Sequence, residues 1–95
     1  MKVVVKRVGQ KPEIQEIDGS LESMQEVVGG YIQVLGLPYN MVLVCNEEGV
    51  LLEMEENFRI GHYVFFGDVF FCGQLGESFI GLSEMQIAEA LLLLN

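Results

Sequence analysis

The chain has 95 residues, of which 51% are hydrophobic, and its five basic and fourteen acidic residues give a formal net charge of −9 at pH 7. This length predicts a single domain over residues 1–95. The negative charge repels phosphate backbones and anionic lipids, which argues against binding to nucleic acid or to a membrane surface. The high apolar fraction predicts that a partner covers part of the surface, in a homo-oligomer that is most simply a dimer.

The N-terminal region is predicted to form a β-hairpin. Alternating residues indicate a half-buried strand over Met1–Val8, with Val3 and Val5 on one face. Gly9–Pro12 supplies turn residues, and Glu13–Ile17 returns as a second, more polar strand. A cluster of basic residues could contact a phosphate group, but lysines in such a strand are also typical of a sheet edge, where they block unwanted pairing. Four of the five basic residues fall in this region: Lys2, Lys6, Arg7 and Lys11.

A short amphipathic helix is predicted next. Ser20 is a suitable N-cap, and apolar residues recur at helical spacing from Leu21 to Val28. Gly29 tolerates the left-handed backbone that ends helices, and Gly30 lets the chain reverse and lets neighbouring groups come close. We therefore interpret the two glycines as a joint between a helix and a strand.

The range Gly29–Asn46 contains no charged residue. It is not predicted to span a membrane, because Gly36 and Pro38 interrupt it and because its residues alternate at period two on either side of a turn. This pattern predicts two buried strands, Tyr31–Leu35 and Met41–Cys45.

The segment that follows is predicted to turn back on the second of these strands. Asn46–Gly49 has the residues of a four-residue turn, with Asn first and a glycine of positive φ last, and Val50–Leu52 would complete a hairpin. Glu53–Asn57 is expected to be irregular. Tyr63–Cys72 is dense in Val and Phe, and Gly67 within it indicates a bulge or a tight turn.

A C-terminal helix is predicted to begin after Ser83, with Gln86 closing a capping box. Leu93 and Leu94 widen its apolar face beyond the needs of one small sheet, which predicts that the helix contributes to a dimer interface. The predicted inner stripe consists of Ile87, Ala88, Leu91 and Leu92.

These elements predict the α+β class. We expect a mostly antiparallel sheet of about five or six strands with two helices, one after the N-terminal hairpin and one at the C-terminus. Cys45 and Cys72 lie in apolar, strand-like surroundings, which predicts buried free thiols. With no N-terminal signal segment, the expected location is the cytoplasm.

A set of short motifs carries a resemblance that spans most of the chain. The motifs are Asp18–Glu22, Val28–Ile32, Asn46–Gly49, Asn57, Gly67–Val69 and Leu82–Ser83. Together they resemble the domain of unknown function 3846 family, which occurs in phages and other mobile elements. The resemblance implies an accessory phage protein that acts in the host cytoplasm, and it leaves the molecular role open. The segment Ala90–Leu94 departs from the family in being more apolar.

The residue types offer little for catalysis or for metal binding. His62 is the sole histidine, so any nucleophile assisted by His and any zinc site must use it. The acidic residues lack the alternate-position spacing of a calcium loop, and the pair Glu47-Glu48 is better explained by the turn that contains it. We therefore predict no metal, no cofactor and no enzymatic activity.

Three residues are candidates for binding a small ligand. Tyr31 and Arg59 can stack on a planar ligand, and Arg59 is the only cation outside the N-terminal cluster, so it could hold an anion. Asn57 adds a polar group next to a turn.

Three classes of function follow. The first is a non-enzymatic accessory protein that binds a host protein, for example to blunt a defence system. The second is an oligomeric sponge for a small anionic, nucleotide-like signal, and the third is an enzyme. An exposed apolar or acidic patch favours the first, and basic and aromatic residues that converge favour the second. A cluster of His62 with a cysteine and a carboxylate favours the third.

Overall fold

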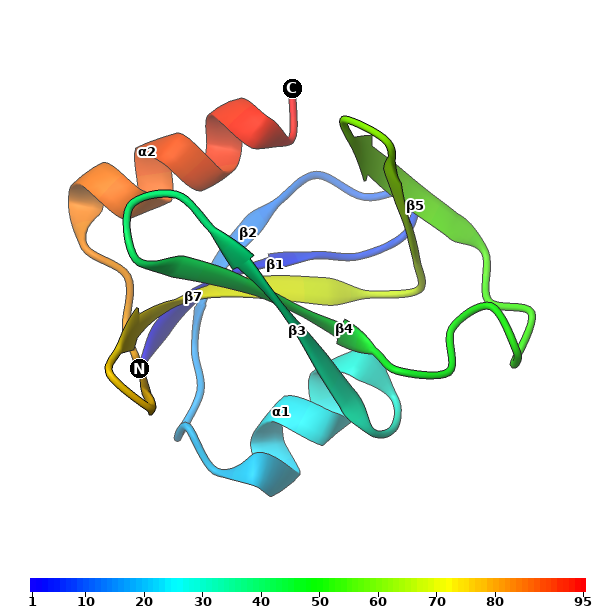
Figure 1. Cartoon of the computed structure of the whole chain (residues 1–95), viewed down its shortest axis with the longest axis horizontal. Helices are drawn as coiled ribbons and strands as arrows, with labels where there is room; N and C mark the ends of the chain where they lie inside the picture. The colour runs from blue at the N-terminus through cyan, green and yellow to red at the C-terminus, as the bar shows by residue number, and fades with distance from the viewer.

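The structure is a computed structural model that describes residues 1–95. Its elements are β1 (Lys2–Lys6), β2 (Glu13–Glu16), α1 (Leu21–Val28), β3 (Ile32–Leu37), β4 (Met41–Asn46), β5 (Glu56–Ile60), β6 (Tyr63–Phe66), β7 (Val69–Leu75), β8 (Ser78–Ile80) and α2 (Glu84–Leu93). A six-stranded antiparallel sheet has the order β2-β1-β7-β4-β3, with β8 paired to β7, and β5 and β6 form a separate hairpin (Figure 1). The predicted α+β class, with two helices and a mostly antiparallel sheet, is confirmed.

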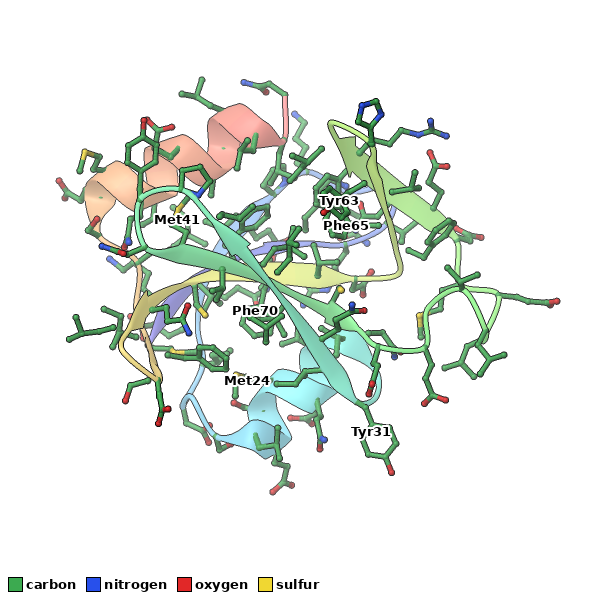
Figure 2. The ribbon with its side chains drawn as sticks, in the orientation of Figure 1. Met24, Tyr31, Met41, Tyr63, Phe65 and Phe70 are labelled. Atoms are coloured by element: carbon green, nitrogen blue, oxygen red, sulfur yellow. The ribbon has the colours of Figure 1, made fainter.

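Two cores lie on opposite faces of the sheet. One lies against α1 and includes Met24, Val28 and Phe70, and the other lies against α2 and β6 and includes Met41 and Phe65. Figure 2 shows Met24 and Phe70 side by side between α1 and the sheet, and Met41 on the side of α2. Both faces of the central strands are therefore covered.

The prediction that the first strand is half buried is wrong. Val3, Val4 and Val5 are all fully buried, because Val3 and Val5 face the α1 core and Val4 faces the α2 core. The lysines of β1 do not mark a sheet edge either, since β1 lies between β2 and β7. Lys6 Nζ instead donates hydrogen bonds to Arg7 O and to Asn57 Oδ1.

The joint between α1 and β3 is confirmed. Ser20 caps the helix by accepting a hydrogen bond from the Ser23 N–H at 3.0 Å. Gly29 has a φ of +78°, and the N–H groups of Gly29 and Gly30 both donate to the Gln25 carbonyl. A Cβ on Gly30 would lie 2.8 Å from Asn46 Nδ2, so a larger residue here would require the Asn46 side chain to move.

The predicted return strand at Val50–Leu52 is wrong, although the turn before it is confirmed. The Asn46 side chain accepts a hydrogen bond from the Glu48 N–H, and the Gly49 N–H donates to Asn46 O. The chain then continues in turns, because Leu52 N–H bonds back to Glu48 O and Met54 N–H to Gly49 O. The segment Glu53–Asn57, which was predicted to be irregular, is so only up to Glu55, since β5 begins at Glu56.

Two glycines mark the turns of this half of the chain. The expected positive φ at Gly49 is wrong, and glycine is needed there for close packing instead, since a Cβ would lie 3.2 Å from Phe66 O. Gly67 separates β6 from β7 with a φ of +79°, which confirms a tight turn inside the predicted Tyr63–Cys72 strand.

The capping box of α2 is confirmed, and its inner stripe is partly wrong. Ser83 Oγ accepts from the Gln86 N–H, and Gln86 Oε1 accepts from the Ser83 N–H. The residues that face the core are Ile87, Ala90, Leu91, Leu93 and Leu94. Ala88 and Leu92 point outward, and Leu92 is 64% exposed. The helix is therefore rotated by about one position from the predicted orientation, and it leaves less apolar surface for a dimer than expected.

Candidate functional site

The largest concave feature is a groove of about 520 Å³ on the α2 face of the sheet, which we call the apolar groove. Its floor comes from β3 and β4, its wall from β6, and its end from the turn after β4. The lining residues are Gln33, Leu35, Cys45, Asn46, Glu47, Glu48, Gly49, Val50, Leu51, Tyr63, Val64, Phe65 and Phe66. Eight of these thirteen residues are hydrophobic, so the groove is suited to apolar side chains.

The strand register explains the floor of the groove. Gln33 is paired with Cys45 and Leu35 with Leu43, so these side chains share one face of the sheet. The wall is stiffened by aromatic packing, with ring centroids 5.1 Å apart for Phe58 and Phe65 and 6.5 Å apart for Tyr63 and Phe65. Figure 2 shows Tyr63 and Phe65 together on this side of the sheet.

One end of the groove carries negative charge. Glu47 and Glu48 lie in its lining, and no basic residue does. The three salt bridges of the protein pair Glu16 with the N-terminus, Glu13 with Arg7, and Glu56 with Arg59, so the two glutamates have no cationic partner. The groove therefore combines an apolar floor with an uncompensated negative end.

The turn that closes the groove exposes three aliphatic side chains in succession. Val50 is 71% exposed, Leu51 is 76% exposed and Leu52 is 54% exposed. Val50 and Leu51 also line the groove. Full burial of one such side chain contributes about 1.5–3 kcal/mol of favourable free energy, so a partner surface that covers this turn gains binding free energy. Contiguous exposed apolar surface of this kind marks interaction sites.

The residues predicted to bind a small ligand are not brought together within the chain. Tyr31 is 64% exposed before β3, and Figure 2 shows its ring pointing away from the molecule. Arg59 is on the β5–β6 hairpin and pairs with Glu56 at 3.2 Å. Neither residue lines either of the two cavities, and Asn57 does not do so either.

The Asn57 side chain has a structural role. Its Nδ2 donates to the carbonyls of Lys6 and Gly67, each at 2.8 Å, and its Oδ1 accepts from Lys6 Nζ. These bonds tie β5 to the end of β1 and to the turn between β6 and β7. Every polar atom of the Asn57 side chain is therefore occupied within the protein.

The two thiols and the histidine differ in their exposure to solvent. Both cysteines are free, as predicted; Cys72 is fully buried, whereas Cys45 is only partly buried on the groove floor. Burial raises the pKa of Cys72 to about 12 and also raises the pKa of Cys45. His62 is exposed in the β5–β6 turn. No group of three or more His, Cys, Asp or Glu side chains is placed to hold a metal ion.

The groove was not foreseen from the sequence. The uncharged range up to Asn46 and the apolar run Val50–Leu52 are both visible in the chain. Val50–Leu52 is predicted from the sequence to be the return strand of a hairpin, whereas these side chains lie exposed in a turn. The lining also combines segments far apart in the sequence, from Gln33 to Phe66.

These features define a small α+β domain with an open apolar groove beside the last strand of its sheet. The family model described as "Domain of unknown function (DUF3846)" matches residues 1–94, and the chain belongs to this family. The resemblance seen in the short motifs is thus confirmed. No curated protein and no solved structure matches the chain. Neither α1 nor α2 is long and apolar enough to cross a membrane.

Proposed function

We propose that this protein acts by binding a protein partner through the apolar groove and the Val50–Leu52 turn. The observation that carries the proposal is the continuity of three exposed aliphatic side chains with an apolar groove that ends in two unpaired carboxylates. A protein surface supplies both an apolar contact and a counter-charge. The family resemblance adds the context: an accessory protein of a phage or another mobile element, which acts on a host protein in the host cytoplasm.

A role in binding without turnover is supported by the state of the candidate nucleophiles. The raised pKa of the Cys45 thiol keeps it protonated, which makes it a poor nucleophile, and Cys72 is fully buried. His62, which is exposed in the β5–β6 turn, belongs to no group of three or more His, Cys, Asp or Glu side chains that could hold a metal ion. A small anionic ligand bound by Tyr31 and Arg59 would require that two copies of the chain bring these residues together.

The test is native mass spectrometry after incubation with a lysate of the host cell. We expect the wild type to retain a protein in fixed stoichiometry, and Leu51→Asp to weaken that retention about tenfold or more, because the charge lies in the centre of the contact. The matched control is Leu21→Asp, since Leu21 is 55% exposed on α1 and lies outside the groove. Retention of a small molecule, or of a protein that Leu51→Asp does not affect, would contradict the proposal.

We also propose that the protein forms a homodimer through α2. The outward face of this helix carries Met85, Ala88 and Leu92 at helical spacing, and Met85 and Leu92 are 65% and 64% exposed. This interface would leave the apolar groove free. Light scattering is expected to give twice the chain mass at micromolar concentration, and Leu92→Glu is expected to give the monomer.

A further inference from the structure

The strand beside the apolar groove has an open hydrogen-bonding edge. β3 is the last strand of the sheet, and the carbonyl of Tyr31, the residue before it, accepts a hydrogen bond from Glu47 N–H on the β4 side. In an antiparallel pair, the backbone N–H and C=O groups of every second residue bond to the partner strand, and those of the residues between them point to the other side of the strand. The register therefore directs the N–H and C=O groups of Ile32, Val34 and Gly36 away from β4, to the open edge.

None of the usual protections against pairing is present on this edge. β3 is six residues long, contains no charged residue and no proline, and pairs with β4 in unbroken register from Ile32 to Leu37. Natural edge strands are shielded by lysines, prolines, bulges or short length. Val34, in the middle of the strand, is 40% exposed. The β3 edge is thus able to accept a further strand.

A strand added along this edge would also use the groove. Side chains of neighbouring strands that lie opposite each other share a face of the sheet. Residues opposite Gln33 and Leu35 would therefore point to the groove side, because these two residues form part of its floor. An apolar residue opposite Leu35 would lie over the groove. The residue two positions away, beside Gln33, would point to the same face and lie nearer to Glu47 and Glu48.

The charge at the groove end selects the kind of strand. Glu47 follows β4 opposite Tyr31, just beyond β3, and has no cationic partner. The β3 of a second copy is uncharged, and four of the five basic residues of the chain lie before residue 12. Pairing of two β3 edges would therefore leave the carboxylates uncompensated. A segment with its own Lys or Arg compensates them.

We propose that β3 and the apolar groove bind an extended segment of a partner protein by strand addition, with an apolar residue over the groove and a Lys or Arg two positions away facing Glu47 and Glu48. This inference rests on the proposed function, in which the groove binds a protein. Backbone hydrogen bonds to Ile32, Val34 and Gly36 supply the contact to the edge, and the groove and the carboxylates supply the selectivity.

The test selects short random peptides on the wild-type protein. Enriched peptides are expected to carry an apolar residue and a Lys or Arg two positions apart. Val34→Lys is expected to weaken their binding about tenfold or more, because a charged side chain in the middle of the edge strand opposes pairing with an added strand. The matched control is Ile14→Lys on β2, the other edge of the sheet, where Ile14 is 55% exposed; this variant is expected to bind as the wild type does.

Two measurements address the backbone contact directly. Hydrogen exchange of the Ile32, Val34 and Gly36 amides is expected to be fast in the free protein and to slow about tenfold or more with an enriched peptide. N-methylation of alternate peptide amides is expected to abolish binding in one register and to spare it in the other, since only every second amide of an added strand faces β3.

The outcomes separate the two proposals. Peptides that need Leu51 but bind equally well in both methylated forms, with no slowing of exchange at the three amides, would overturn strand addition and leave the groove as a protein-binding site. Failure to enrich any peptide would also overturn strand addition. In the lysate experiment, a wild type that retains no protein, or retains one equally well after Leu51→Asp, would overturn the proposed function itself.

Discussion

The two edges of the main sheet are built in opposite ways. β2 has four residues, of which Glu13 and Glu16 are charged, and each of these carboxylates has a partner: Arg7 at 3.4 Å and the N-terminal amine at 3.3 Å. β3 has six residues and no charge, and it lies beside an apolar groove.

The difference between the edges indicates which edge of the sheet can pair with a strand of another chain. Charged side chains along β2 oppose pairing with another chain at little cost in stability. β3 has no charged side chain that would oppose pairing in this way. The position of β3 depends instead on its links to α1 and to the turn after β4, through Gly29, Gly30 and Asn46. Three of the four predictions below test those links, and the last tests the β2 side.

The largest effect is expected for Asn46→Ala. Asn46 is 5% exposed, its Nδ2 donates to Val28 O at 3.1 Å, and its Oδ1 accepts from Glu48 N–H at 2.7 Å. The substitution leaves both backbone groups without their partner, which should lower the free energy of unfolding by about 2–4 kcal/mol. Urea denaturation measures this loss. The control is Asn95→Ala, whose exposed side chain makes no hydrogen bond; an equal loss in both variants would contradict the assigned role of Asn46.

The next effect contrasts two glycines of the same region. A Cβ on Gly30 would lie 2.8 Å from Asn46 Nδ2, so Gly30→Ala should lower the free energy of unfolding by about 1–3 kcal/mol. A Cβ on Gly36 meets no atom within 4 Å, and Gly36→Ala should be neutral or stabilising by up to about 1 kcal/mol. The pair is compared by thermal and urea denaturation. Equal stability of the two variants would show that Asn46 moves aside without cost.

A smaller effect is expected for Gly29→Ala. The φ of +78° is unfavourable for alanine, while the space is adequate, since the nearest atom to a Cβ is Met54 Cε at 3.9 Å. The expected loss is about 1 kcal/mol and comes from backbone strain alone. An unchanged denaturation midpoint would mean that the end of α1 adapts to a right-handed residue.

The smallest effect on stability is expected from protonation of the Asp18 carboxylate, which lies shortly after β2. Hydrogen bonds from the side chain and backbone of Ser20, with a lesser one from Ser23, lower the pKa of Asp18 from 3.8 to about 2. Because the pKa is lower in the folded state, the contribution to stability is present above pH 3.8 and is lost as the pH falls through about 2. NMR titration should give this midpoint for the Asp18 carboxyl. A midpoint near the ordinary value would contradict the Ser20 contact.

The sequence by itself determined the local features of this protein. The cap at Ser20, the left-handed Gly29, the Asn46 turn and the capping box at Ser83 were all predicted and are all present. The alternating patterns also predicted the class of fold, and the motifs predicted the family. These features depend on backbone preferences and hydrogen bonds within a few residues, which a short stretch of sequence contains.

Tertiary structure alone decided which surfaces are left open. Val3–Val5 is buried on both faces because α1 and α2 lie on opposite sides of β1. β3 is also apolar, but it is an edge strand because it pairs only with β4, and β4 pairs with β7 on its other side. Val50–Leu52 has the composition of a buried strand, yet it stays exposed because the bonds of Leu52 and Met54 hold it in turns. Strand order and the apolar groove depend on pairing between segments distant in sequence, and no local pattern encodes which of several apolar strands will be last in the sheet.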